Sequence, residues 1–149
     1  MTPAQQLQTL LHRDIPLTRA MDLQVVAWQA GELRLRLPLA GNTNHTASMF
    51  GGSLYSAAVL AGWGWLLLRQ WEAGIDDGHI VIQEGSIEYP LPVSGDAVAV
   101  CAAPTDERWQ RFEKTYRRRG RARLQLETRI LDTEGAEAVR FRGSYVLHR

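Results

Sequence analysis

The sequence predicts an α+β fold in which a six-stranded antiparallel sheet covers one long apolar helix. Six segments alternate apolar and polar residues with the period of two that is typical of strands buried on one face. Between the second and third of these segments, 20 residues from Met49 to Leu68 contain no charged side chain. A chain of 149 residues with 45% hydrophobic content can bury one core, so we expect a single domain over residues 1–149.

A short helix and a hairpin are predicted at the start of the chain. Thr2 can begin a capping box with Pro3 at the first helical position, and the Ile15-Pro16 pair ends the helix. Residues 23–28 and 33–39 then alternate apolar and polar side chains on either side of a turn. We therefore predict a short N-terminal helix followed by two paired strands.

The long helix is predicted from Gly52 to Ala73, with Gly74 as its stop signal. It is apolar on nearly all sides, which is typical of a buried helix, although 20 uncharged residues are also long enough to cross a bilayer. Four glycines dilute its hydrophobicity, and the strands that follow need an apolar partner, so we expect no membrane span. The sheet cannot cover every side of this helix. We therefore expect a homodimer and leave open whether dimers pair into tetramers.

The second half of the chain is predicted to complete the sheet. Thr105 can cap a short basic helix, and Gly120 can end it. The predicted elements are four strands over residues 79–89, 97–103, 121–130 and 139–147, with the short helix over residues 106–119 between the second and third of them.

Charge is distributed unevenly, although the net charge is only +1. Residues 104–123 hold eight of the 17 basic residues against three acidic ones, so this segment carries +5. Such a patch suits an anionic partner: a carrier protein, the phosphates of a coenzyme or nucleic acid. We expect four arginines to make this contact: Arg117, Arg118, Arg119 and Arg121. A solvated basic face is the alternative. The stacking aromatics of a nucleic-acid platform are not evident, so we expect no nucleic-acid partner.

The single cysteine, Cys101, lies among small apolar residues of a predicted strand, where a packed thiol is expected. One cysteine cannot form an internal disulfide, which fits a reducing cytoplasmic compartment. The first 14 residues have neither the basic start nor the continuous apolar core of an export signal. Three histidines, His12, His79 and His148, are scattered without partners at ligand spacing, so we expect no metal site.

The residues from Asn44 to Ser53 carry the most specific chemical signal. Gly51 and Gly52 stand at the start of the long helix, where unpaired backbone amides and the helix dipole attract negative charge. Donors placed in this way can form an oxyanion hole, and the side-chain amide of Asn44 can add a donor from the loop. A plain tight turn explains a Gly-Gly pair before a helix about as well.

The order of the predicted elements and the segment from Asn44 to Gly52 resemble the hotdog-fold thioesterases. Their motif has Asn, five residues and then His-Gly-Gly before the central helix, and Phe50 stands at the histidine position here. The chain resembles, over nearly its whole length, a thioesterase-like hotdog domain that also occurs fused behind an acetyltransferase domain. The segments that carry this resemblance are Asn44-His45, Phe50 to Ser56, Ala58 to Gly64, Ile80 to Gln83 and Pro92 to Asp96.

The resemblance implies a hotdog fold, in which the sheet wraps around the central helix, and an acyl-thioester substrate on acyl carrier protein (ACP) or coenzyme A. It implies no resident cofactor, because coenzyme A or phosphopantetheine enters as part of the substrate. Members of this group include malonyl-ACP decarboxylases that feed fatty-acid synthesis.

The chain departs from the hotdog thioesterase pattern at one informative position. Many of those enzymes have an Asp or Glu nine positions after the motif histidine, and Val59 stands there in this chain. A valine can neither attack a thioester nor take a proton from water. Glu84 on the following strand is a candidate substitute, although a solvent position is an equally good interpretation. Decarboxylation of a malonyl thioester needs only donors for the enolate oxygen beside an apolar wall, so the missing acid favours it over hydrolysis.

These considerations give a set of candidate site residues. We expect Asn44, Gly51 and Gly52 to stabilise the developing negative charge. The candidates for substrate binding are His45, Phe50, Ser53, Tyr55, Val59 and Glu84, and a turn residue is the alternative interpretation for the histidine. Three classes of function stay open at this point: an acyl-thioester enzyme (decarboxylase or hydrolase), a non-catalytic module that binds acyl chains or carrier protein, and a nucleic-acid binder.

Overall fold

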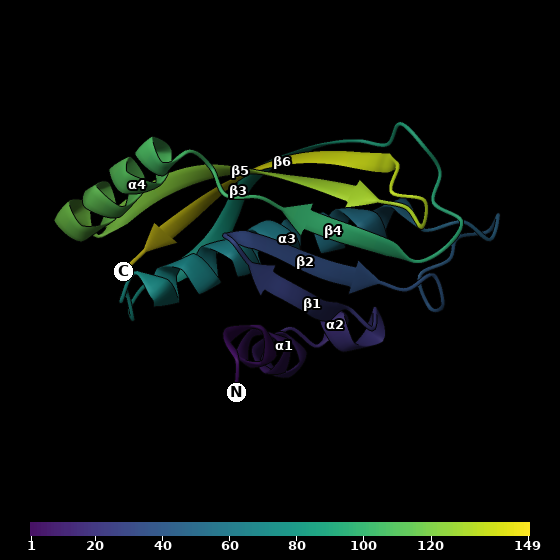
Figure 1. The fold of residues 1–149 in the computed structure, drawn as a ribbon, viewed down its shortest axis with the longest axis horizontal. Coiled ribbons are helices and arrows are strands. Elements are labelled where there is room, and N and C mark those ends of the chain that lie inside the picture. The colour runs from purple at the N-terminus through teal and green to yellow at the C-terminus, as the bar shows by residue number, and fades with distance from the viewer.

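The computed structural model describes all 149 residues as a six-stranded antiparallel sheet that curves around one long helix, which is the predicted α+β architecture (Figure 1). The strand order across the sheet is β1-β2-β4-β5-β6-β3. The elements are α1 (Pro3–Asp14), α2 (Leu17–Ala20), β1 (Gln24–Gln29), β2 (Glu32–Leu37), α3 (Gly51–Glu72), β3 (His79–Glu88), β4 (Ala97–Cys101), α4 (Asp106–Arg119), β5 (Arg121–Leu131) and β6 (Glu137–His148).

Helix α1 begins as predicted and closes one edge of the sheet. The Thr2 side chain accepts the N–H of Gln5, whose own side chain accepts the N–H of Thr2, so the capping box is complete. The side chain of Gln8 accepts the N–H of Val25 at 2.6 Å and donates to the carbonyl of Leu23 at 3.1 Å. These bonds occupy backbone groups at the start of the β1 edge, which would otherwise be available to another strand. The single turn α2 was not predicted; it follows Pro16 directly.

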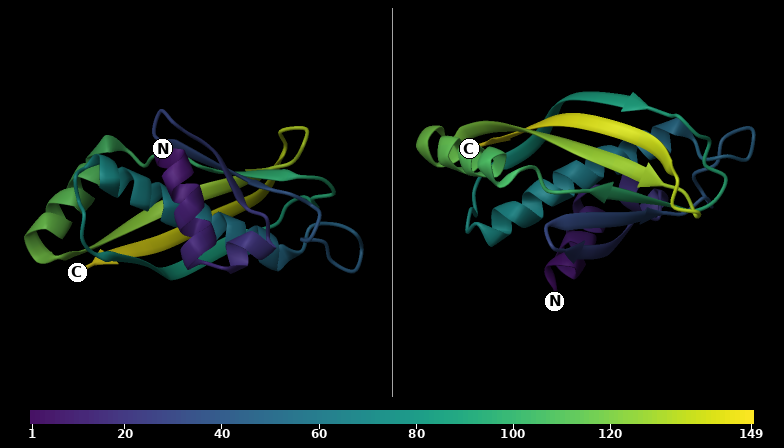
Figure 2. Two further views of the ribbon diagram at one scale, coloured as in Figure 1. Left: turned by 90° about the horizontal axis from the view of Figure 1, so that it is seen from below. Right: turned by 45° about the horizontal axis from the view of Figure 1, so that its top comes forward.

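Helix α3 forms the centre of the core. The right-hand view of Figure 2 shows the sheet curving around it, and eleven of its 22 residues are buried. By length and composition this helix is apolar enough to cross a membrane, but more than half of its apolar stretch is buried within this fold. It is therefore the core helix of a globular domain, as the sequence indicates. Gly74, with a φ of +72°, ends it as predicted.

Strand β3 lies at the other edge of the sheet and pairs only with β6. Eight of its ten residues are exposed, including Val81 and Ile82. A bulge between Ile82 and Glu84 shifts the register with β6. Helix α3 contacts this strand, and the indole N–H of Trp63 donates to the carbonyl of Ile80 at 3.2 Å, but no strand pairs along the outer side of β3.

Helix α4 and the start of α3 lie at opposite ends of the molecule (Figures 1 and 2). The helix begins and ends as predicted, because Thr105 accepts the N–H of Arg108 and Gly120 takes a left-handed φ of +71°. Its buried aromatic side chains pack near the C-terminal half of α3, where the rings of Trp109 and Trp65 lie 5.8 Å apart. The loop over residues 41–50 extends from the other end of the fold.

Candidate functional site

Two asparagines hold the loop that leads into α3. Asn42 is only 3% exposed, and its side-chain Nδ2 donates to the carbonyls of Met21 and Pro38. Its backbone carbonyl accepts the N–H of Phe50 at 2.7 Å. No local sequence pattern marks this asparagine as the structural anchor, because its partners Met21 and Phe50 lie elsewhere in the chain. The loop is thereby attached firmly to the rest of the fold where it enters α3.

The carboxamide of Asn44 closes the tip of the same loop. Its Oδ1 accepts the backbone N–H groups of Thr46 at 2.9 Å and Ser48 at 3.1 Å, and its Nδ2 donates to Oγ of Ser48 at 2.9 Å. This arrangement is an Asx turn, in which the side chain substitutes for a backbone bond. The oxygen is therefore used within the loop, and only one N–H of the side chain remains available to a ligand.

The first turn of α3 presents two backbone amides without partners. Phe50 takes an extended conformation (φ −64°, ψ 131°) and its carbonyl accepts the N–H groups of Ser53 and Leu54. The N–H groups of Gly51 and Gly52 donate to no group in the chain. Both glycines are partly accessible, so the positive end of the helix dipole and two free donors face the outside here.

The ring of Phe50 lies against Gly52. A Cβ atom at position 52 would stand 2.3 Å from Cε2 of Phe50, so the glycine makes room for this ring. The Phe50 side chain remains 55% exposed. The phenylalanine therefore covers part of the first turn with an apolar surface.

Tyr89 is a site residue that the sequence analysis missed. It follows β3 directly, and its hydroxyl donates to the carbonyl of Gly51 at 3.0 Å. That carbonyl and the N–H of Gly52 belong to one peptide group, so the bond polarises the peptide and strengthens the donor. Partial burial raises the pKa of Tyr89, which keeps the hydroxyl protonated and able to donate. No local pattern marks this tyrosine, because it reaches α3 only through the tertiary fold.

Tyr55 and Val59 continue one half-buried face of α3 beyond the free amides. The ring of Tyr55 packs edge-on against Phe141 with centroids 5.4 Å apart. The Val59 side chain is half-buried, and its backbone carbonyl accepts the hydroxyl of Tyr145 at 2.7 Å. The half-buried Ser53 lies in the same first turn as the two glycines. The surface next to the free amides is therefore largely apolar and carries no charge on α3.

Glu84 does not belong to this site. It pairs directly with Ser144, which in turn pairs with the exposed Gln125, and directly opposed residues share a face of the sheet. Glu84 therefore faces the convex side, away from α3. Simple alternation from Ile80 and Ile82 would have pointed it towards the helix, but the bulge reverses the alternation. Within one chain the bulge therefore separates Glu84 from the free amides, and its role in substrate binding stays a prediction.

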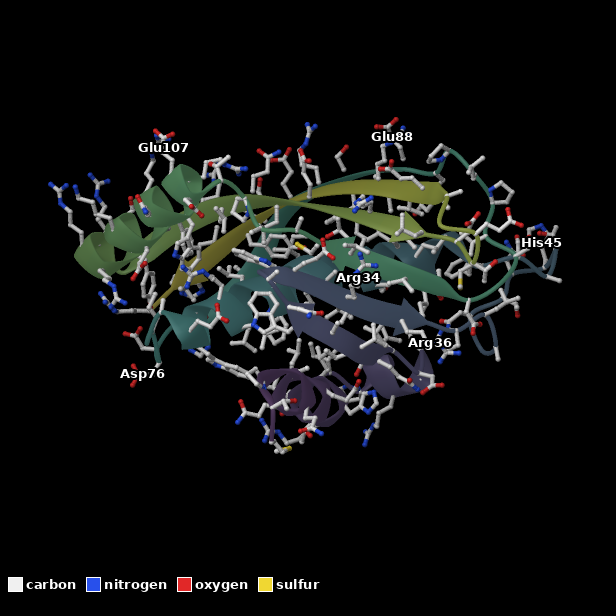
Figure 3. The ribbon with its side chains drawn as sticks, viewed as in Figure 1. Arg34, Arg36, His45, Asp76, Glu88 and Glu107 are labelled. Atoms are coloured by element: carbon white, nitrogen blue, oxygen red, sulfur yellow. The ribbon has the colours of Figure 1, made fainter.

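The predicted His45 and the acidic residue Glu88 also make no contact with the free amides. His45 is exposed at the end of the molecule and makes no hydrogen bond (Figure 3). Glu88, the last residue of β3, projects from the convex side in the same figure and pairs in register with Arg140. No group of three or more His, Cys, Asp or Glu side chains lies together in a way that would hold a metal ion.

The predicted anion-binding arginines lie at the far end of the same chain. Arg118, Arg119 and Arg121 are exposed, whereas Arg117 bonds Glu113 at 2.9 Å and the carbonyl of Ala73 at 2.7 Å. They stand at the end of α4 and the beginning of β5, which the whole length of the sheet separates from Gly51. Within one chain the fold does not bring the two predicted sites together.

The main hollows of the single chain also lie away from the free amides. None of the five is lined by Asn44, Gly51 or Gly52. These five hollows therefore do not contain the free donors at the start of α3.

A six-stranded antiparallel sheet wrapped around a central helix that begins with two free amides defines a hotdog protein of the thioesterase superfamily. Residues 4–149 match the family described as "Putative thioesterase (yiiD_Cterm)", and the chain belongs to that family.

Solved structures support the same assignment. A protein from Chlorobaculum tepidum is 32% identical with a TM-score of 0.92, and the match covers 98% of this chain and 94% of that one. A protein from Shewanella oneidensis described as a "putative thioesterase" is 29% identical with a TM-score of 0.85, covering 99% and 98%. A "probable thioesterase" from Pseudomonas aeruginosa is 26% identical with a TM-score of 0.84, covering 99% and 96%. The resemblance to the hotdog thioesterases is thus confirmed.

Proposed function

We propose that this protein is an acyl-thioester enzyme and that its favoured reaction converts malonyl-ACP to acetyl-ACP. One observation carries the proposal: the free N–H groups of Gly51 and Gly52 stand beside an apolar face of α3 on which no carboxylate is present. Preorganised backbone donors of this kind stabilise an oxyanion, and a single such donor is typically worth about 3 kcal/mol of transition-state energy.

The chemistry needs no protein nucleophile. The bond between the malonyl methylene carbon and its carboxylate breaks, and the electron pair moves into the thioester carbonyl to form an enolate as carbon dioxide leaves. The two glycine amides would hold the enolate oxygen, with the polarised Gly52 N–H as the stronger donor. A proton from water on the methylene carbon then gives the acetyl thioester. The apolar side chain of Val59 leaves the carboxylate poorly solvated, which favours its loss as a neutral gas.

Hydrolysis of acyl thioesters is the second candidate, and the description of the family favours it. Hydrolysis requires a base or nucleophile near the thioester carbon. Val59 cannot serve, and both Glu84 and Glu88 lie on the convex face of the sheet. A non-catalytic module that binds acyl chains or carrier protein is the third candidate, and free donors beside an apolar surface are compatible with it.

The proposed substrate carries its own cofactor, so no resident group is required. Coenzyme A and the phosphopantetheine of ACP both end in the thiol that bears the acyl group, and both present phosphate. The basic residues of α4 and β5 supply the opposite charge. We further propose that the protein works in the cytoplasm, since the buried Cys101 is the only cysteine in the sequence.

The functional unit in this proposal is a homodimer that joins two β3 edges. The side chain of Gln8 on α1 occupies backbone groups at the start of the β1 edge, whereas β3 has no strand on its outer side and exposes Val81 and Ile82. Beside it, α3 presents a half-buried stripe at helical spacing: Tyr55, Val59, Trp63 and Leu67. A second copy related by a two-fold axis would pair with the strand and cover the stripe.

The decisive experiment removes one proposed donor without disturbing the helix. Proline lacks an N–H and is favoured at the first helical position, and Phe50 already has the extended conformation that a residue before proline requires. Gly51→Pro should therefore fold normally and reduce kcat for malonyl-ACP by about 10²–10³-fold. Gly51→Ala retains the N–H, and its Cβ would meet only ordinary contacts at 3.5 Å or more, so it should retain most of the activity.

Mass spectrometry of the products separates the three candidates. Acetyl-ACP and carbon dioxide support the proposal, and free malonate or a free fatty acid would replace it with hydrolysis. A wild-type protein that binds malonyl-ACP or acyl-ACP without turnover would be a binding module. Asn44→Asp gives a further distinction, because it keeps the acceptor oxygen of the loop and removes the side-chain N–H. The substitution also removes the Nδ2 bond to Ser48 and adds a negative charge, so full activity in this variant would exclude Asn44 as a donor.

A further inference from the structure

We infer that the groove between α4 and β5 is the docking surface for an acidic carrier protein and that it serves the free amides of the partner subunit in a homodimer. This inference rests on the proposed function and on the β3-to-β3 dimer. Beyond those two proposals, it assigns where the carrier protein docks, which residues form the docking surface and which subunit's amides that surface serves.

The groove is lined by arginine and by no acidic residue. Two adjoining hollows of about 180 and 420 Å³ share Thr115, Ala122 and Arg123. Five arginines line them: Arg108, Arg111, Arg119, Arg121 and Arg123. The predicted Arg117 and Arg118 are not among them.

Three of these guanidinium groups are free to meet a partner. Arg119, Arg121 and Arg123 are exposed and have neither an ion pair nor a hydrogen bond to a side chain or carbonyl within the chain. Arg108 donates to the carbonyl of Gln125 at 2.6 Å, so its charge is not neutralised. Arg111 reaches Glu107 only at 3.7 Å with both side chains largely exposed. The groove therefore keeps most of its positive charge.

The extent of the charge favours a protein surface over a single phosphate. From Arg108 to Arg119 the helix rises about 16 Å, at about 1.5 Å per residue. Exposed guanidinium groups spread over such a length do not converge on one small ligand, but they match an acidic surface of similar length. They also steer a negatively charged protein towards the groove before contact.

The geometry of the dimer decides which amides the groove serves. The end of β3 lies near Gly51, because Tyr89 bonds the carbonyl of that glycine. The start of β3 lies level with the start of β5, because His79 pairs with His148 and His148 pairs with Arg121. Within one chain, the two ends of β3 are about 30 Å apart for a strand of ten residues. A two-fold axis makes the paired β3 strands antiparallel, so the start of one lies beside the end of the other.

The partner's groove is then nearer to Gly51 than the groove of the same chain. The path from the end of β3 to the partner's Arg121 crosses the partner's β3 and β6 and ends on its β5. These are three strand spacings of about 4.8 Å, or about 14 Å in all. Arg121 and Arg123 alternate in phase with Gln125 and so face the convex side, so the arm of a docked carrier must also pass around the ends of the strands to reach Gly51. Measured along the sheet, the partner's groove is still less than half as far from Gly51 as the groove of the same chain. Docking and chemistry would thus occur on different subunits.

Charge reversal in the groove tests the docking surface. Arg121→Glu combined with Arg123→Glu should raise KM for malonyl-ACP at least tenfold and reduce its salt dependence. The matched control is Arg19→Glu with Arg129→Glu, which makes the same charge change at two exposed arginines that lie outside the groove and, like Arg121 and Arg123, have no ion pair. Equal effects of the two pairs would overturn the assignment, and so would a groove variant that loses affinity for a DNA duplex but not for ACP.

Mixed dimers test which subunit is served. One subunit carries Gly51→Pro, the other carries the two groove substitutions, and the mixed dimer is purified through two different tags. We expect about half of the wild-type kcat/KM, measured at low carrier concentration, because one intact amide site faces one intact groove. Activity as low as that of either variant homodimer would show that each groove serves its own chain and would overturn the inference.

Failure of the proposed function can be distinguished from failure of this inference. If the wild-type protein turns over no acyl-ACP, the function is wrong, and equilibrium binding of malonyl-ACP to the groove and control variants still decides the docking surface. If turnover is normal but groove and control variants behave alike, only the docking inference fails.

Discussion

Replacing Gly62 with alanine should destabilise the protein, although alanine is the better helix former. A Cβ atom at position 62 would stand 2.3 Å from the hydroxyl oxygen and 2.5 Å from Cζ of Tyr145. Tyr145 is fully buried, and its hydroxyl donates to the carbonyl of Val59, so the ring cannot simply turn away. Gly62 therefore leaves the room in which the Tyr145 ring packs against α3.

The expected loss of stability is the sum of two unfavourable effects and one favourable effect. Overpacking a core costs about 1–3 kcal/mol, and loss of the Tyr145 hydrogen bond adds about 1 kcal/mol. The intrinsic helix preference of alanine over glycine returns about 1 kcal/mol. The free energy of unfolding should thus fall by about 1–3 kcal/mol, and the melting temperature by about 2–12 °C for a chain of this size.

Gly52→Ala provides the matched comparison in the same helix. The added Cβ would also meet a ring at 2.3 Å, but that ring is Phe50, which is 55% exposed and can move into solvent. Its melting temperature should stay within about 4 °C of the wild-type value. Calorimetry of both variants checks the reasoning. If Gly62→Ala melts at or above the temperature of Gly52→Ala, then Tyr145 moves aside at little cost and the reasoning is refuted.

Three further predictions concern single side chains. Tyr89→Phe should lower kcat for malonyl-ACP with little change in KM and shift the amide resonance of Gly52, because the hydroxyl polarises that peptide group; an unmoved resonance would refute this role. Cys101 should resist iodoacetamide at pH 8 until the protein is unfolded, since burial raises the pKa of its thiol to about 12, and rapid alkylation of the folded protein would contradict its position. The hydrogen bonds from Arg149 and from Tyr116 lower the pKa of Asp77. The contribution of Asp77 to stability is therefore fully present above about pH 3.9, the ordinary pKa of an Asp side chain, and it is lost as the pH falls through the lowered pKa. Asp77→Asn should accordingly flatten the acid limb of the stability profile, and chemical denaturation between pH 2 and 5 measures this.

Local signals in the sequence were sufficient for most elements of the fold. The capping box at Thr2, the cap at Thr105 and the stop at Gly120 act within a few residues, so the sequence alone located both short helices. The alternation in β5 matches its burial residue by residue. The free amides of Gly51 could also be predicted, because every helix start leaves its first amides without partners inside the helix.

The site depended on contacts that no local pattern contains. Asn44 was predicted as a donor from its place in a motif, but the fold uses most of its carboxamide to close a turn. Tyr89 reaches Gly51 across 38 positions of the chain, and only the path of β3 brings it there. Residues so far apart in sequence leave no periodic signature, so sequence patterns cannot show that they meet.

The sequence by itself determined the type and order of nearly all elements, the central helix and the free donors at its start, because these follow from periodicity, capping and turn chemistry. Tertiary structure alone decided which face Glu84 takes, since one extra residue in a bulge reverses the alternation of a strand. It also decided that the basic helix lies a sheet length from Gly51 in the same chain. That separation depends on the path of the whole sheet, and it is the physical reason for expecting a second subunit to complete the site.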